Sequence, residues 1–340
     1  MEQRGALSRD RRGFIRVFAG GLLVLPLIVP RVARAQSGDL IQIGLLRLGN
    51  AASSERYLDA LRQGLREHGY VEGRNLALRP RYADGKAERL AALATELVNL
   101  KVRIIVTTDT PATLAARQAT TTIPIIFTTA ADPVGTGLVV SLAHPGGNIT
   151  GLSNMAGDIS SKHVELLAAV VPRLSLIAVL TNPANPAHRS ILNSVQAACG
   201  RAGIKGLPFE ANTPEKIDDA FPAMAKDHVG AVIIALDPFF SQQRRQIADL
   251  LIKYRLPSIG SNADYVDSEP PMLMSYGQDV ADHWRRAAAY CDKILKGAKP
   301  SDLPVEQSET LRLVIRLRAA KDLGITVPYS VLVRADRVIE

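Results

Sequence analysis

The chain alternates between short runs of β-branched and other apolar residues and longer amphipathic segments, and this alternation limits the possible folds most. Runs such as Leu40–Leu46 and Val102–Thr107 have the length and composition of buried strands. Glu55–His68 has apolar residues at helical spacing, and Pro111–Thr120 begins with a proline that a first helical turn tolerates. Strands that alternate with helices in this way predict βαβ units and a parallel sheet.

The pattern stops and then restarts, which predicts two similar lobes. A loop over residues 130–153 carries turn-forming Pro and Gly residues, and the strand–helix pattern resumes at Lys162–Val171. The chain also exceeds the size at which single hydrophobic cores stop growing, about 250–300 residues. We therefore expect an α/β protein with two doubly wound, Rossmann-like lobes joined by a three-strand hinge. The expected boundaries are residues 38–152 plus 265–300 for lobe 1 and residues 153–264 plus 301–340 for lobe 2, with connecting strands near residues 152–154, 262–266 and 299–304.

The first 35 residues have the pattern of an export signal. Arg11 and Arg12 precede an apolar run from Val17 to Val29, which is shorter than the about 20 residues that a membrane span needs. Small residues at positions 33 and 35 then match a signal-peptidase site. We expect a twin-arginine (Tat) signal peptide over residues 1–35, cleavage after Ala35 and a periplasmic protein; an uncleaved anchor helix is the alternative.

Most of the positive charge belongs to this signal segment. The whole chain carries +8, and residues 1–35 hold seven Arg against Glu2 and Asp10, a net of +5, which leaves +3 for the rest (8 − 5). A weakly charged remainder without long Lys/Arg runs gives no support for a nucleic-acid partner.

Signals for catalysis or metal binding are weak. The chain has neither a phosphate-cradling glycine loop nor a Gly-x-Ser-x-Gly elbow, and its six His show no metal-type pairing. Cys199 and Cys291 lie within helical patterns, which favours buried thiols; a disulfide and a two-cysteine isomerase are the alternatives. We expect no enzyme activity, no cofactor and no metal site.

Polar residues follow nearly every expected strand. Ligands of open α/β sheets bind outside the carboxyl ends of the strands, so these residues are the candidate binding site. Hydroxyl, amide and carboxylate groups suit a small polar or zwitterionic ligand, although the same residue types also form helix N-caps. From Asp237 in particular we expect that replacement by alanine weakens binding while the fold survives. The candidate residues are Asn50, Thr108, Asp109, Thr110, Thr129, Asp132, Asn154, Asn182, Asp237, Asn262 and Tyr276.

Several motifs follow one another in order along the chain: Gly69–Asn75, Asp132–Leu138, His144–Leu152, Asn182–Pro186, Leu273–Gly277, Ile294–Pro300 and Leu303–Gln307. Through these motifs the chain, from Ile41 to Glu340, resembles the ABC transporter substrate-binding proteins, the family that includes tryptophan- and tyrosine-binding members. Thr107–Asp109 and Ser261–Asn262 depart from the pattern, which leaves the ligand open.

The resemblance implies a fold, a site and partners. It implies a type I periplasmic-binding-protein fold, capture of a small molecule between the lobes by hinge closure, and no catalysis. It also implies an inner-membrane ABC permease with its ATPase as partners of a monomeric binding protein. An amino acid is the first hypothesis for the ligand. A ligand-binding input protein for a signalling receptor would have the same lobes and is the alternative function.

Overall fold

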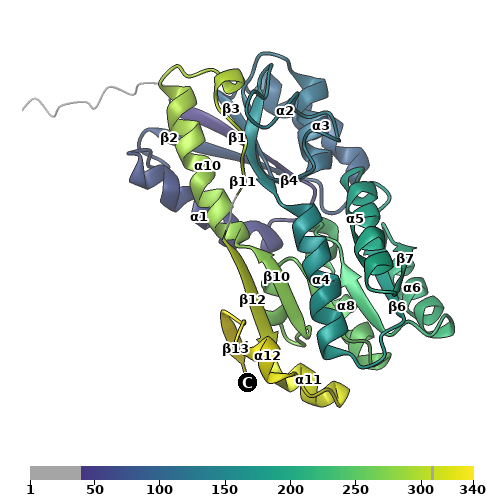
Figure 1. Ribbon diagram of the computed structural model, residues 1–340. Coiled ribbons are helices and arrows are strands. Elements are labelled where there is room, and N and C mark those ends of the chain that lie inside the picture. The colour runs from purple at the N-terminus through teal and green to yellow at the C-terminus, as the bar shows by residue number, and fades with distance from the viewer. Residues whose placement is uncertain (1–39, 308–309) are drawn as a thin grey trace, which may run out of the picture. The chain divides into compact units, whose positions relative to one another are not determined.

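The computed structural model describes residues 40–307 and 310–340, and it confirms the expected two-sheet α/β architecture (Figure 1). The predicted signal segment lies outside these residues. Within the described residues, no helix combines the length and apolar character that crossing a bilayer requires.

The first sheet is entirely parallel, as the strand–helix alternation predicts. Its side chains alternate between two faces, because successive residues of a strand point to opposite sides. Ile104 and Val106 pack against helices α1 and α10, whereas Ile105 packs against helices α2 and α3. The strands, in spatial order, are β11 (Glu306–Gln307), β5 (Ile149–Asn154), β4 (Ile125–Ala131), β3 (Ile104–Thr107), β1 (Ile41–Arg47) and β2 (Leu76–Tyr82). The helices are α1 (Glu55–Glu67), α2 (Leu90–Asn99), α3 (Thr110–Ala119) and α10 (Val280–Leu295).

The second sheet is parallel except for one pair, β10 with β12. One core lies between this sheet and helices α4, α5, α11 and α12, and another lies beneath α6, α7 and α8. The strands, in spatial order, are β13 (Arg337–Ile339), β12 (Leu311–Arg316), β10 (Met274–Gln278), β9 (Ser258–Gly260), β8 (Ala231–Ile234), β6 (Leu176–Thr181) and β7 (Lys205–Glu210). The helices are α4 (Ala156–Val170), α5 (Ala187–Arg201), α6 (Pro214–Lys226), α7 (Pro238–Gln242), α8 (Arg244–Lys253), α9 (Asp264–Asp267), α11 (Leu317–Leu323) and α12 (Tyr329–Leu332).

The chain crosses between the sheets three times, but two crossings differ from the expected positions. The first follows β5 at Asn154, as predicted. The second lies between β10 and α10, not near residues 262–266, because Leu273 and Met274 are buried in the core of the second sheet. The third lies between β11 and β12 rather than near residues 299–304, since β11 pairs with β5. Strand β10 therefore belongs to the second sheet although the expected boundary assigned it to lobe 1.

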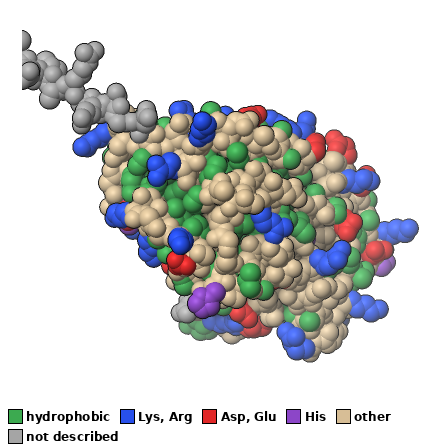
Figure 2. Space-filling model, turned by 90° about the horizontal axis from the view of Figure 1, so that it is seen from above, with side chains coloured by type: hydrophobic (Ala, Val, Ile, Leu, Met, Phe, Trp, Pro, Cys, Tyr) green, Lys and Arg blue, Asp and Glu red, His purple; other side chains and the backbone are tan. Residues whose placement is uncertain are grey.

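Charged side chains are mixed rather than gathered by sign on the face shown in Figure 2. Lys and Arg side chains are scattered there and interspersed with Asp and Glu. On this face the distribution gives no basic footprint of the kind that nucleic-acid binding needs.

Candidate ligand-binding site

A cavity of about 40 Å³ lies where strands of both sheets end. Its wall includes Arg47 and Asn154 from strands of the first sheet and Asp237, which directly precedes α7 in the second lobe. Seven of the eleven candidate residues line it: Thr108, Asp109, Thr110, Thr129, Asn154, Asp237 and Asn262. The rule that ligands of open α/β sheets bind at the carboxyl ends of strands therefore brings most of the candidates together.

The Asp109 carboxylate is buried and accepts three hydrogen bonds. Its oxygens accept from Ala112 N at 2.9 Å, from Thr108 Oγ1 at 2.7 Å and from Leu48 N at 3.3 Å. Burial raises the pKa of Asp109 above its ordinary value, although these hydrogen bonds act against that shift. Asp109 is thus the N-cap of α3 and at the same time part of the cavity wall.

Asp237 has the same two roles in the second lobe, because it caps a helix and lines the cavity. Its side chain has no exposed surface. It caps α7 by accepting from Phe239 N at 2.8 Å, and it also accepts from Asn182 Nδ2 at 3.2 Å and Asn185 Nδ2 at 2.9 Å. The helix-cap interpretation therefore holds for both aspartates, and it does not remove either from the cavity.

Four candidates do not line this cavity. Asn50 accepts a hydrogen bond from Ser53 N, and Asp132 accepts one from Gly135 N, each at 2.9 Å. Asn182 lies one layer behind the wall, where it holds Asp237. The Tyr276 ring packs edge-on against the His163 ring, beside the core that lies between the second sheet and helices α4, α5, α11 and α12.

The cavity wall also contains residues that were not among the sequence candidates, and these include Arg47, Tyr57 and Trp284. Tyr57 on α1 and Trp284 on α10 stack with ring centroids 5.9 Å apart, and the Arg47 guanidinium lies 5.0 Å from the Tyr57 centroid. Arg47 is the last residue of β1, so its place at a strand end was a usable signal. Trp284 looked like one member of an apolar helical stripe, and nothing local marked it as part of the site.

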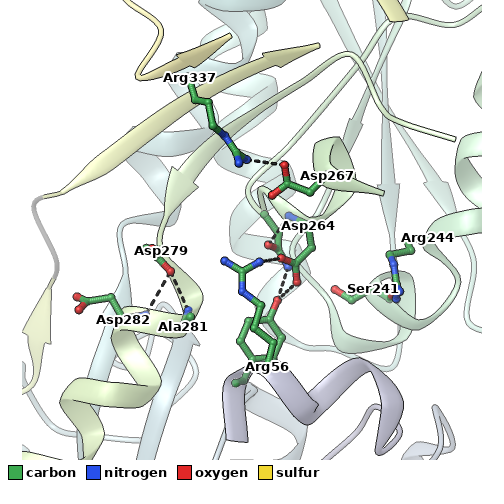
Figure 3. A network of polar contacts seen from close by, with 11 residues as sticks. Arg56, Ser241, Arg244, Asp264, Asp267, Asp279, Ala281, Asp282 and Arg337 are labelled. Atoms are coloured by element: carbon green, nitrogen blue, oxygen red, sulfur yellow. Dashed lines mark hydrogen bonds and ion pairs between the residues drawn. The ribbon is translucent and has the colours of Figure 1, made fainter. Parts of the chain in front are cut away.

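Direct contacts join the two lobes beside this cavity, in a group that we call the lobe latch: Arg56, Tyr57, Asn262 and Asp264. The Asp264 carboxylate accepts hydrogen bonds from Arg56 and from the Tyr57 hydroxyl, and Asn262 Nδ2 donates to the same hydroxyl at 2.9 Å. Figure 3 shows Arg56 reaching Asp264 from α1, with the separate Asp267–Arg337 pair nearby. The latch residues also border a neighbouring cavity of about 230 Å³.

The buried His163 beside the cavity makes stability depend on pH. It lies on α4, donates a 2.7 Å hydrogen bond from Nε2 to the Tyr276 carbonyl, and is 2 % exposed. Burial lowers the pKa of His163 to about 4. The unfolded chain, in which histidine has its ordinary pKa, therefore binds the proton more tightly, and stability is lost as pH falls from about 6.5 towards 4.

We expect this histidine to lower the free energy of unfolding by about 2 kcal/mol between pH 7 and pH 5. Guanidinium denaturation of wild type and His163→Gln at both pH values measures the difference. His144→Gln is the control, because His144 is exposed and its loss should leave the pH dependence unchanged. An identical pH dependence in wild type and His163→Gln would contradict the assignment.

The two cysteines lie away from the cavity. Both are free and buried, Cys199 on α5 and Cys291 on α10. Burial raises the pKa of both thiols, that of Cys291 to about 12. The thiolate form that a catalytic cysteine needs is therefore disfavoured at both positions. Among the described residues, no group of His, Cys, Asp and Glu could hold a metal ion.

The fold and the cavity define a two-lobed α/β protein of the type I periplasmic-binding class. The family model described as ABC transporter substrate binding protein matches residues 44–339. The chain belongs to that family, which confirms the resemblance noted in the sequence.

Individual relatives agree with this assignment. The chain is 24 % identical over 281 residues to a tyrosine-binding protein of Clostridioides difficile (strain R20291), covering 83 % of this chain and 80 % of that one. A structure of a conserved domain protein from Vibrio cholerae matches with a TM-score of 0.82 and 29 % identity, covering 87 % of this chain and 99 % of that chain. An ABC domain from Streptococcus pneumoniae in complex with L-Trp matches with a TM-score of 0.81 and 27 % identity, covering 88 % and 100 %.

Proposed function

We propose that this chain is the extracytoplasmic binding component of an ABC importer and captures a small molecule, an amino acid, by closing its two lobes. The observation that carries this proposal is the cavity lined from both sheets at their strand ends. Because polar groups from both lobes reach it, a ligand there would be held fully only when the lobes meet. Family membership supports the same role and gives no reason to expect catalysis.

Two relatives support an amino-acid ligand. Their descriptions name tyrosine and L-Trp. The cavity of this chain offers hydroxyls, amides and carboxylates together with the Tyr57–Trp284 aromatic pair. Such a wall suits a zwitterion with an apolar side chain.

Export and partners follow from the sequence. The Arg11–Arg12 pair and the small residues before Gln36 support a Tat signal cleaved after Ala35 and a periplasmic location. We expect the mature protein to act as a monomer that delivers its ligand to an ABC permease and its ATPase.

Hinge closure is supported by the three chain crossings between the sheets. Segments of this kind allow lobes to rotate as bodies while each core stays packed. We assign the first sheet with α10 and β11 to lobe 1, and the second sheet from α4 to β10 and from β12 to the C-terminus to lobe 2.

The test of this function is thermal unfolding of residues 36–340 against amino acids, nucleobases, sugars and small carboxylates. A ligand at about 100 times its dissociation constant stabilises by roughly 2.7 kcal/mol, a shift of several degrees. Small-angle scattering of the same samples should show compaction on binding. If no compound shifts the transition and mass spectrometry finds no ligand carried through purification, the binding role is refuted.

The lobe latch gives a prediction about closure. We expect Asp264→Ala to weaken ligand binding about tenfold, because it removes the acceptor that holds Arg56 and Tyr57 only in the closed form. Titration calorimetry measures the change. Asp267→Ala is the matched control on the same helix, since its partner Arg337 lies in the same lobe. Equal affinities of the two variants would show that the latch does not contribute to closure.

A further inference from the structure

Arg47 carries a buried positive charge without a hydrogen-bond or ion-pair partner in the described part of the chain. Only 5 % of this residue is exposed. Within residues 40–307 and 310–340, its guanidinium makes no hydrogen bond and no ion pair, and Nε is enclosed without an acceptor. Burial lowers the pKa of Arg47, which reflects the cost of keeping this charge away from water. Five donors in a rigid fork therefore remain available.

The carboxylates nearest to Arg47 are already engaged. Asp109 accepts from two backbone amides and one hydroxyl at the start of α3. Asp264 is held by the lobe latch. Both raise the affinity of the guanidinium for its proton through space, but neither forms a salt bridge with it. The positive charge of Arg47 is thus balanced only by carboxylates that form no ion pair with it.

Aromatic rings position the guanidinium. Its central carbon lies 5.0 Å from the Tyr57 ring centroid and 5.9 Å from that of Trp284. A side chain at Gly49 would come within 3.1 Å of Nε, so the glycine leaves space for the group. Contact with ring faces leaves the in-plane N–H groups of a guanidinium free for a planar oxyanion.

Two more unpartnered polar atoms lie on the same cavity wall. Trp284 Nε1 is a buried donor without an acceptor, and Asn154 Oδ1 is a buried acceptor without a donor. The unpaired donors gather at Arg47 and Trp284, whereas acceptors are supplied by Asn154 and the nearby Asp237. Buried polar groups of proteins are nearly always paired, so these atoms on the cavity wall are available to pair with a ligand.

We propose that Arg47, with Trp284 beside it, binds the carboxylate of the ligand, and that the substrate class is amino acids held with the carboxylate towards lobe 1 and the ammonium group towards Asn154 and Asp237. This inference rests on the proposed binding function. A doubly negative phosphate fits less well, because the carboxylates of Asp109 and Asp237 line the same cavity. A zwitterion instead meets an opposite charge at each end.

Matched pairs of probes test the anchor. Each pair differs only by the carboxylate: L-tryptophan and tryptamine, L-tyrosine and tyramine, L-leucine and isoamylamine. We expect wild-type protein to bind at least one of the amino acids, and to bind its amine at least about 100-fold more weakly. Arg47→Gln should lose at least about 100-fold in affinity for that amino acid and no longer distinguish it from the amine. Arg103→Gln is the control, because Arg103 is exposed and precedes β3 at the opposite strand end.

A second readout needs no ligand. Arg47→Met keeps an unbranched apolar side chain, although a shorter one, and removes the unpaired charge, so we expect the ligand-free variant to unfold at a temperature at least about 2 °C higher than wild type. A purely structural arginine would give a lower temperature instead. The combination of higher stability with lost amino-acid binding is the expected signature of the anchor.

The outcomes separate the two proposals. Binding of a sugar or nucleobase with affinity unchanged in Arg47→Gln would overturn the anchor and leave the binding function standing. Equal binding of an amino acid and its amine, or a lower unfolding temperature for Arg47→Met, would also overturn the anchor. Binding of no compound by wild-type protein that mass spectrometry shows to carry no ligand from purification would refute both.

Discussion

Replacing Gly151 by alanine is expected to lower the free energy of unfolding by about 3–6 kcal/mol. Gly151 lies in β5 opposite Phe127 of β4, with φ +148°, a conformation that side chains disfavour. A Cβ atom there would lie 2.0 Å from the Phe127 carbonyl oxygen. That oxygen belongs to the backbone of a central strand, so relief requires the two strands to separate.

Guanidinium denaturation of the purified variant measures this loss. If the variant does not fold, we expect its expression to yield only insoluble protein. Gly200→Ala is the matched control, because Gly200 lies in α5 and a Cβ there meets nothing within 4 Å. That change should stabilise by about 0.5–1 kcal/mol, since alanine favours a helix over glycine. A Gly151→Ala protein as stable as wild type would show that the β4–β5 pairing can widen without cost.

The second large effect is expected at Asp237, whose replacement by alanine should cost about 3–5 kcal/mol. Its carboxylate is fully buried and receives hydrogen bonds from Asn182, Asn185 and the Phe239 amide. Removing it leaves three buried donors unsatisfied and an uncapped α7. From sequence alone we expected weaker binding with an intact fold; the structure adds a role in stability to that expectation.

Stability and affinity have to be measured separately for this residue. Asp237→Ala should show reduced stability in denaturation without ligand, and Asp249→Ala, an exposed carboxylate on α8, should stay within about 0.5 kcal/mol of wild type. If Asp237→Ala is as stable as wild type, then supplying these buried hydrogen bonds is not the main role of Asp237.

The general fold could be predicted because the hydrophobic pattern of each segment indicates whether that segment forms a strand or a helix. The run Val102–Thr107 contains a parallel strand, and Pro111 lies in the first turn of α3, where its missing N–H costs nothing. The sheet to which β10 belongs could not be predicted in the same way. Its pairing with β9 and β12 depends on contacts between distant segments, and its own residues suit either sheet.

The wall of the candidate cavity could be predicted to a similar extent. Strand ends gave most of the cavity wall, since topology alone brings them together. The sequence could not distinguish Asp109 as a helix cap from Asp109 as a ligand contact, and the structure makes it the cap of α3 and part of the cavity wall. The pairing of Arg47 with Trp284 escaped prediction because these residues are far apart in sequence and meet only after α10 has returned to the first sheet.

The return of α10 to the first sheet has a consequence for how the protein is made. The ribosome synthesises the chain from its N-terminus, so N-terminal domains begin to fold before C-terminal domains have been made. The face of the first sheet that carries Ile43 and Leu45 is covered partly by α10, so it stays open until residue 295 has been synthesised. During that interval the whole second sheet up to β10 is already present. We therefore expect the first sheet, although it is synthesised first, to be the part of the nascent protein that depends on chaperones for longest.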